Sequence, residues 1–358
     1  MNSTFENLFV LEIANNHWGS VERGTRIIRD FTQLARFNNV RACIKFQFRN
    51  VDTFIHKDFR QRSDIRYVKK TLDTRMEQEG FATMIKAVRE GGCLVGATPF
   101  DEKSVKMCVD LGVDIVKIAS SDINDWYLIE EIAKTKKPVA FSTGGSSLKD
   151  IDDVVKFFDN RHIPLAINHC VSLYPTHDSA LEMNQVDFLK ARYPHHTIGF
   201  SSHEYSDWRS SILIAYAKGA RIFERHIDIE DGPQPVSPYC TKPEQCDEWF
   251  KAFHKAVEMC GGSSAQRRIV SEAETLYLDS LVRGVYVKRD LPKGHSLTDE
   301  DLYLAIPLQK RQLSCRELMR GEVLLCDVQQ DAPLYIDQVD TPYAHNPALA
   351  QFFNRRGL

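Results

Sequence analysis

Charged and polar residues that could do chemistry recur where short apolar runs of the sequence end. Lys45, Lys117, His203 and His226 each occupy such a position. Lysine supplies a point charge for phosphate or carboxylate, and neutral imidazole is a common ligand of divalent metals. Small hydroxyl residues occupy equivalent positions in other runs: Thr98, Ser120, Ser142, Ser172 and Ser201. One such serine or histidine alone is usually structural, but the set together predicts a site for a phosphate-bearing ligand beside a metal ion.

The elements that must position these residues alternate along the chain. Eight apolar runs are expected as strands: 8–14, 42–48, 93–98, 114–120, 138–143, 164–170, 197–202 and 220–227. Their nearly continuous apolar content is typical of parallel strands buried on both faces. Amphipathic segments between them are expected as helices: 21–37, 76–91, 101–111, 126–135, 147–159, 180–192, 206–218 and 242–259. Eight such units predict an α/β fold, a (β/α)8 TIM barrel, with a doubly wound open sheet as the alternative.

A barrel places its active site at the C-terminal ends of its strands, where this chain is consistently polar. Besides the residues above, these ends carry Glu12, Asn15, Asn16, His17, Gln47, Thr143, His169 and Glu224. Such convergent polarity favours a functional site over a purely structural barrel.

The C-terminal quarter differs in character from the rest. Residues 261–279 lack periodicity and are expected to form a linker after a catalytic domain at 1–260. Residues 280–340 alternate β-rich runs with polar turns, which predicts a small β-rich domain, and 341–358 is expected as a loosely ordered tail.

Composition excludes several functional classes. The 46 basic and 49 acidic residues give a formal net charge of -3, which offers nothing to attract nucleic acid or an anionic membrane. The nine cysteines include no CxxC pair, as expected for reduced thiols in the cytoplasm. The N-terminus has no signal-peptide pattern, and no stretch approaches the ~18 apolar residues of a spanning helix.

An ordered series of motifs resembles the N-acetylneuraminate (sialic acid) synthase family. It comprises EIANNHWGS (12–20), KFQ (45–47), ATPFD (97–101), KIASSD (117–122), HCVSLYP (169–175), IGFSSHE (198–204) and ERHI (224–227). The segment VKRDLPKGHSLTDEDL (287–302) resembles the antifreeze-like, or SAF, β-clip domain that follows the barrel in that family. The resemblance runs in order from about residue 8 to about residue 338.

The resemblance implies a PEP-dependent transferase. Phosphoenolpyruvate (PEP) would condense with an open-chain aldose, N-acetylmannosamine or a related acylamino sugar, to give a 2-keto-3-deoxy nonulosonic acid and phosphate. Lys45, Lys117 and the five hydroxyl residues would bind PEP. His203 and His226 would hold a divalent metal, manganese first, with magnesium or cobalt as alternatives. Glu12 and Asp122 would serve acid–base chemistry and, with Gln47, Tyr174 and Gln234, contact the acceptor; a domain-swapped homodimer is also implied.

Two departures from the family pattern concern the acceptor. Gln234 replaces an aspartate, and Ile306 stands where the SAF domain has an arginine, with Arg311 as a nearby candidate substitute. We therefore keep three alternatives: a synthase with a different aldehyde acceptor, a sibling enzyme condensing PEP with an aldose phosphate, and a catalytically silent sugar- or partner-binding barrel. The basic segment FRQRSDIRYVKK (59–70) is expected as a solvated loop face, with a lid as the alternative.

Overall fold

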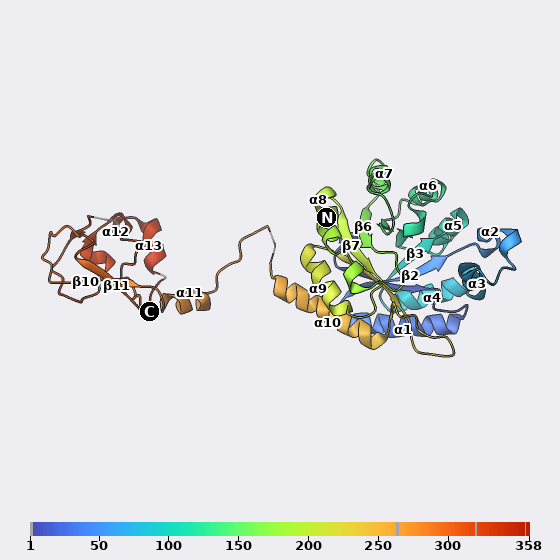
Figure 1. The fold of residues 1–358 in the computed structure, drawn as a ribbon, viewed down its shortest axis with the longest axis horizontal. Coiled ribbons are helices and arrows are strands. Elements are labelled where there is room, and N and C mark those ends of the chain that lie inside the picture. Colours follow the sequence, from blue (N-terminus) through green and yellow to red (C-terminus); the bar gives the residue numbers. More distant parts are fainter. Residues whose placement is uncertain (1–2, 263–264, 319–320, 355) are drawn as a thin grey trace. The chain divides into compact units, whose positions relative to one another are not determined.

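The computed structural model describes all residues except 1–2, 263–264, 319–320 and 355. It consists of two compact units, Met1–Gly261 and Gly262–Leu358, which we describe separately (Figure 1).

The first unit is a closed barrel of parallel strands. The strands are β1 (Leu8–Ala14), β2 (Arg41–Phe48), β3 (Leu94–Pro99), β4 (Ile115–Ile118), β5 (Val139–Ser142), β6 (Leu165–Cys170), β7 (Thr197–Ser202) and β8 (Ile222–Ile227). Each strand pairs with the next, and β1 pairs with β8, so the sheet has no open edge there. A short strand, β9 (Cys240–Thr241), pairs in parallel with the end of β8. The predicted (β/α)8 barrel is confirmed, and the β1–β8 pairing excludes the open sheet.

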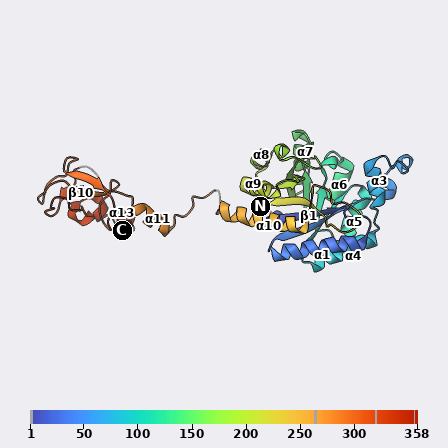
Figure 2. The same ribbon diagram turned by 60° about the horizontal axis from the view of Figure 1, so that its bottom comes forward.

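Helices surround the barrel and connect its strands (Figures 1 and 2). They are α1 (Val21–Phe37), α4 (Gln78–Glu90), α5 (Glu102–Asp110), α6 (Trp126–Lys134), α7 (Leu148–Asp159), α8 (Asn184–Arg192), α9 (Trp208–Lys218) and α10 (Pro243–Cys260). The connection after β2 holds two further helices, α2 (Val51–Phe54) and α3 (Arg66–Asp73). The end of the basic segment is therefore helical and not a loop.

Local sequence explains where these helices begin. Ser20, Asp101, Asp125, Ser147 and Asp207 each accept a hydrogen bond from a backbone N–H in the first turn of the helix that follows. Such side chains satisfy donors that have no partner within the helix. The helices pack buried apolar residues against the strands, which fixes the strand ends as a rigid platform.

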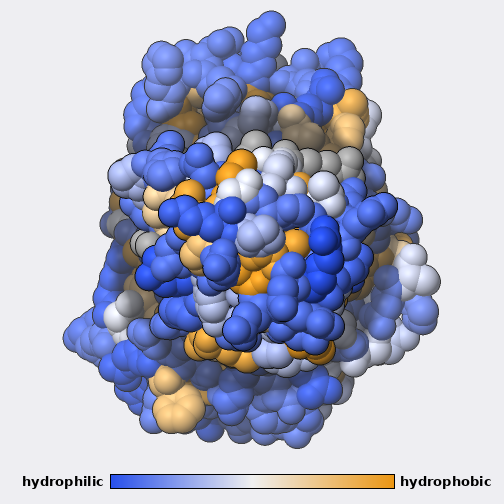
Figure 3. Space-filling model, turned by 90° about the vertical axis from the view of Figure 1, so that its left-hand side faces the viewer, coloured by the Kyte–Doolittle hydropathy of each residue, from blue (hydrophilic) through white to orange (hydrophobic). Residues whose placement is uncertain are grey.

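The second unit has its own hydrophobic core. It contains the antiparallel pairs β10 (Gly284–Val287) with β11 (Leu302–Ala305) and β12 (Val323–Leu324) with β13 (Val339–Asp340). Buried aliphatic residues of these strands and their connections form the core. The face shown in Figure 3 is mostly hydrophilic, with hydrophobic side chains gathered in small patches.

The structure has helices in two segments of this region where the sequence analysis expected none. The segment expected as a linker contains α11 (Glu272–Asp279), and the tail contains α12 (Pro342–His345) and α13 (Pro347–Asn354). Asp279 at the end of α11 is fully buried and pairs with Arg356 Nε at 2.5 Å. This pair joins the two ends of the unit, a contact that local periodicity could not indicate. Among the described helices, none has the length and apolarity needed to cross a membrane.

Candidate active site

A buried cluster of charges lies inside the barrel, built from Glu12, Lys45, Lys117 and Glu224. Glu224 Oε1 lies 3.6 Å from Lys45 Nζ, and its Oε2 lies 3.6 Å from Lys117 Nζ. Lys45 also forms an ion pair with Glu12, its neighbour in register on β1. All four side chains are at least nine-tenths buried. The single carboxylate of Glu224 thus serves two ammonium groups.

The electrostatics of this cluster favour an anion. Burial lowers the pKa of Lys45 to about 8, against the opposing effect of Glu224. Burial would raise the pKa of Glu224, but the charges of Lys117 and Lys45 hold it below its usual value. Glu224 is therefore ionised, and its charge favours the cationic form of Lys45. An anion that enters beside them gains attraction in a site that excludes water.

Hydroxyl groups extend the cluster along neighbouring strands. Lys45 Nζ donates to Thr98 Oγ1 at 3.0 Å, and Lys117 Nζ donates to Ser142 Oγ at 2.6 Å. Ser201 hydrogen-bonds to Glu224. The structure therefore brings five predicted PEP-binding residues into one connected group.

The remaining two predicted hydroxyls, those of Ser120 and Ser172, lie against Gly144. Its backbone N–H donates to Ser120 Oγ at 3.2 Å. A Cβ at Gly144 would lie 2.1 Å from Ser172 Oγ and 3.0 Å from Ser120 Oγ. Only glycine fits between these hydroxyls, and Gly145 follows with a φ of 71°, which turns the chain there. Hydroxyls and turned backbone N–H groups of this kind can cradle an oxyanion.

His203, which directly follows β7, and His226 on β8 lie together with ring centroids 5.5 Å apart. Burial lowers the pKa of His203 to about 4 and lowers that of His226 well below its usual value, so both imidazoles are neutral. His203 Nδ1 lies 3.1 Å from the Val171 carbonyl. Because a carbonyl only accepts, Nδ1 carries the proton and Nε2 keeps its lone pair.

This donor set fits a divalent metal. No hydrogen bond to the His226 ring occurs in the described part of the chain. Two neutral imidazoles with free lone pairs are suitable ligands for a borderline metal ion. The described residues contain no group of three or more His, Cys, Asp or Glu side chains able to hold a metal. Further ligands would therefore have to come from substrate or water.

Aromatic rings surround the two histidines. Tyr174 lies 3.9 Å from the His203 ring, and Tyr239 lies 5.2 Å from His226 and 5.3 Å from Tyr174, measured between centroids. Tyr174 was predicted as an acceptor contact, whereas Tyr239 was missed. Tyr239 immediately precedes β9, and its place depends on the pairing of that short strand with β8.

Asp122 and Gln47 lie on the side toward β2. Asp122 Oδ2 is buried without a hydrogen-bond partner, and burial raises the pKa of this carboxyl. Arg49 Nη2 donates to Gln47 Oε1 at 2.9 Å, and the charges of Arg49 and Asp122 attract each other. Arg49 was also missed, since sequence patterns did not distinguish it from a surface arginine.

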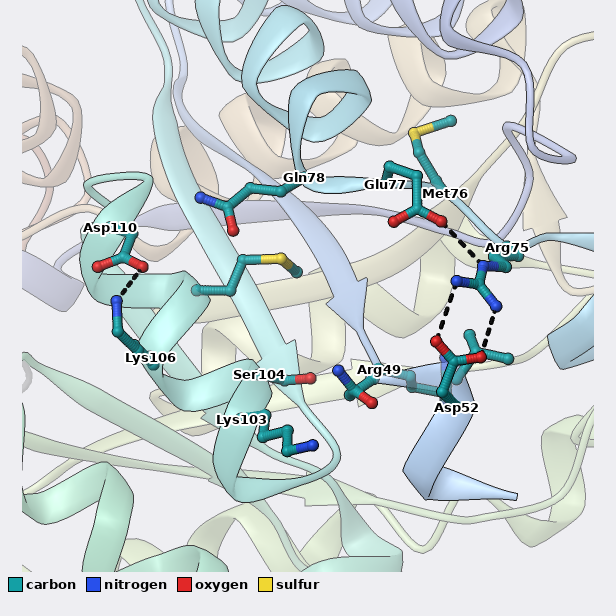
Figure 4. A pocket seen from close by; sticks show the side chains of 13 residues that line it. Arg49, Asp52, Arg75, Met76, Glu77, Gln78, Lys103, Ser104, Lys106 and Asp110 are labelled. Carbon is teal, nitrogen blue, oxygen red and sulfur yellow. Dashed lines mark hydrogen bonds and ion pairs between the residues drawn. The ribbon is translucent and has the colours of Figure 1, made fainter. Parts of the chain in front are cut away.

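Outside the barrel mouth, a hollow of about 310 Å³ lies between the β2 end, α4 and α5 (Figure 4). Its wall includes Arg49, Arg75 and Lys103. Arg75 is bound by Asp52 and Glu77, at 2.7 and 2.9 Å. Because most of its charges are paired and it contains none of the buried lysines or histidines, the chemistry belongs to the barrel interior.

Comparison with known proteins agrees with this arrangement. The model of the NeuB family matches residues 38–265. The chain belongs to the NeuB family. A structure from Chromobacterium violaceum, named for spore coat polysaccharide biosynthesis protein E, superposes on 94% of this chain and all of its own, with a TM-score of 0.89 and 36% identity.

Two curated relatives of this NeuB-family chain carry synthase names. The N-acetylneuraminate-9-phosphate synthase of Drosophila melanogaster is 26% identical over 91% of this chain and 94% of its own. The pseudaminic acid synthase of Campylobacter jejuni is 23% identical over 84% of this chain and 87% of its own. The resemblance to the sialic acid synthase family is therefore confirmed.

Some residues singled out in the sequence do not join the site of this NeuB-family barrel. Gln234 is exposed in the segment between β8 and β9, and no contact links it to the other predicted residues within the described chain. His169 Nε2 hydrogen-bonds to the Leu181 carbonyl at 2.7 Å, which indicates a structural role. Ile306 and Arg311 belong to the second unit, where Arg311 faces Asp337 at 3.9 Å.

Proposed function

We propose that this protein condenses PEP with the open-chain form of an aldose to give a 2-keto-3-deoxy sugar acid and inorganic phosphate. The observation that carries the proposal is the pair of buried ammonium groups, Lys45 and Lys117, that share one carboxylate beside a cradle of hydroxyls and Gly144. PEP carries both a carboxylate and a phosphate, and these two groups can pair with the two ammonium groups.

The step balances with water as the only co-reactant. C3 of PEP forms a bond to the aldehyde carbon, and the aldehyde oxygen takes a proton and becomes a hydroxyl. Water adds to C2, the bond between C2 and the phosphate oxygen breaks, and phosphate leaves. The chain's part is to hold the two reactants together in the correct orientation, which removes much of the entropic barrier.

Two carboxyl groups are placed to move protons. Burial raises the pKa of Asp122 above that of an exposed aspartate, so its carboxyl, which has an oxygen without a partner, holds a proton more readily than an exposed one. That group can donate to the aldehyde oxygen. Glu12 contacts Lys45 and lies beside His226 in the register of β1 and β8, between the two halves of the site. It can accept the proton that the attacking water loses.

His203 and His226 would hold a divalent metal, manganese being our first choice. When bound, the ion would polarise the aldehyde carbonyl as a Lewis acid. Burial keeps both imidazoles neutral, so each has a lone pair for a metal ion. The hydrogen bond to the Val171 carbonyl fixes the tautomer of His203.

A direct test measures phosphate release and keto acid formation from PEP with a panel of 2-acetamido aldoses and added Mn²⁺. Turnover should require both substrates, and Lys117→Met and His226→Ala should each lower kcat/KM by at least about 100-fold. His226→Ala should also reduce Mn²⁺ binding measured without substrate. Lys134→Met changes an exposed lysine on α6 and serves as the matched control. No PEP consumption with any acceptor, and no Mn²⁺ bound, would favour the silent barrel.

A further inference from the structure

A second pair of cations lies near the mouth of the barrel, apart from the lysines assigned to PEP. Arg49 directly follows β2, and Lys70 lies on α3, within the basic segment of the sequence. No carboxylate oxygen lies within 4.0 Å of the charged nitrogens of either residue in the described chain. By contrast, the neighbouring Lys69 pairs with Asp73 on α3.

The guanidinium of Arg49 is held in place, but most of its N–H donors have no hydrogen-bond partner among the described residues. Its Cζ lies 3.7 Å from the ring centroid of Phe100, and one hydrogen bond goes to Gln47. The carboxylate of Asp101 is occupied, because it accepts from the N–H groups of Asn50 at 2.7 Å and Ser104 at 2.8 Å. A guanidinium has five N–H donors, so Arg49 retains several for a ligand.

Lys70 is likewise placed without an ionic partner. Its Nζ lies 5.9 Å from the Trp18 ring, and it is partly buried. Asp228 attracts it, but that carboxylate already pairs with Arg23 Nη2 at 2.7 Å. Cys240 stays neutral because burial raises its pKa to about 12. The ammonium group therefore has spare donors beside an aromatic ring.

The two cations belong to the acceptor half of the site. Gln47, Arg49 and Thr71, the residue after Lys70, line one small hollow at the β2 end. The charges of Lys70 and Arg49 repel each other, and the charge of Lys70 also reaches His226. The charges of Asp122 and Asp101 attract Arg49, but neither carboxylate lies within 4.0 Å of its charged nitrogens, so an anion bound between Arg49 and Lys70 would offset their mutual repulsion.

We propose that Arg49 and Lys70 bind an anionic group on the acceptor aldose, either a phosphate ester or a carboxylate. This inference rests on the proposed condensation. PEP does not account for the pair, because Lys45 and Lys117 already provide its cations. Together these two side chains suit an oxyanion. The planar guanidinium of arginine can donate to two oxygens at once, and the ammonium group of lysine, on a flexible chain, can adjust its position to the bound anion.

The test compares three acceptors: N-acetylmannosamine, its 6-phosphate and the corresponding uronic acid, each with PEP and Mn²⁺. The charged acceptors should have the higher kcat/KM, and whichever is preferred identifies the anion. Arg49→Gln and Lys70→Gln should each raise the KM for that acceptor by about 10- to 100-fold. The KM for PEP should stay unchanged. Lys69→Gln is the matched control on the same helix.

The outcomes separate this inference from the proposed function. Preference for the neutral sugar, with both variants unchanged, would overturn the anion-binding role and leave the condensation standing. No turnover with any acceptor would overturn the condensation. In that case, direct binding of the 6-phosphate and of the uronic acid, measured without PEP, still decides the role of the cations. Lost binding in both variants but not in Lys69→Gln supports it, whereas equal binding refutes it.

Discussion

The buried carboxylate of Glu224 should be the main stabilising partner of the two lysines, and Glu224→Gln removes its charge while keeping its shape. At 3.6 Å, each attraction amounts to about 4–5 kcal/mol with an effective dielectric constant of about 20. Desolvation of the carboxylate offsets much of this, so we expect the variant to lose about 3–5 kcal/mol of unfolding free energy. The urea midpoint should fall by roughly 1 M or more.

The assay follows the barrel alone. All four tryptophans, Trp18, Trp126, Trp208 and Trp249, lie in the first unit, so their fluorescence reports its unfolding. Glu230→Gln is the control, because that exposed carboxylate pairs with Lys242 at 3.0 Å on the surface. It should change the unfolding free energy by less than about 0.5 kcal/mol.

Ligand and pH responses sharpen this prediction. Inorganic phosphate or PEP supplies the missing negative charge, so either should raise the midpoint of Glu224→Gln more than that of the native protein. The folded pKa of Lys45, about 8, lies below its unfolded value, so the native protein loses stability as pH falls towards 8. Without Glu224 that pKa drops further, and the loss should continue below pH 8. Equal midpoints, equal shifts with phosphate and parallel pH profiles would refute the reasoning.

Three further perturbations follow from other contacts. Gly144→Ala places a methyl group against Ser172 and Ser120. The variant should raise the KM for PEP at least about 10-fold and lower the free energy of unfolding by about 1–3 kcal/mol. An unchanged KM for PEP would contradict the proposed role of these hydroxyls in binding PEP. Asp301 is fully buried in the second unit, and its hydrogen bonds with His295, Thr298 and Arg289 hold its pKa below the usual range. Its stabilising effect is therefore fully present above about pH 4 and declines as pH falls further, so calorimetry should show Asp301→Asn weakening the second unit more at pH 7 than near pH 2, and equal weakening at both would contradict this. Deletion of residues 262–358 should leave the tryptophan-monitored unfolding of the barrel intact, because each unit has its own core; a barrel that unfolds on deletion would show otherwise.

Many of the predicted residues that the structure brings together lie on strands or directly after them. A strand fixes which side chains enter the barrel, so Lys45, Lys117, His203 and His226 could be predicted from the positions at which apolar runs end. Such an inference needs only the strand and its direction, and both follow from local pattern.

Residues outside the strands were placed less well, for a physical reason. Gln234 was chosen by motif resemblance, yet the segment between β8 and β9 leaves it exposed and brings Tyr239 to the histidines instead. Arg49 and Lys70 gain their importance because, among the described residues, no carboxylate oxygen lies within 4.0 Å of their charged nitrogens. Neither loop conformation nor the lack of a partner is encoded in a local pattern, because both depend on contacts between distant segments.

In the proposed function, the two substrates contact different kinds of structure. The predicted PEP ligands Lys45, Thr98, Lys117 and Ser142 sit on four consecutive strands, within the packed interior. Tyr239, which lies beside the two histidines, and the proposed acceptor ligands Arg49 and Lys70 lie on the connections between strands. Connections tolerate substitution and insertion far better than a barrel interior does. If the proposed function is correct, substitutions in these loops can change which sugar is accepted while the residues that bind PEP stay the same. Acceptor specificity is then the property that substitutions can alter with the least loss of stability.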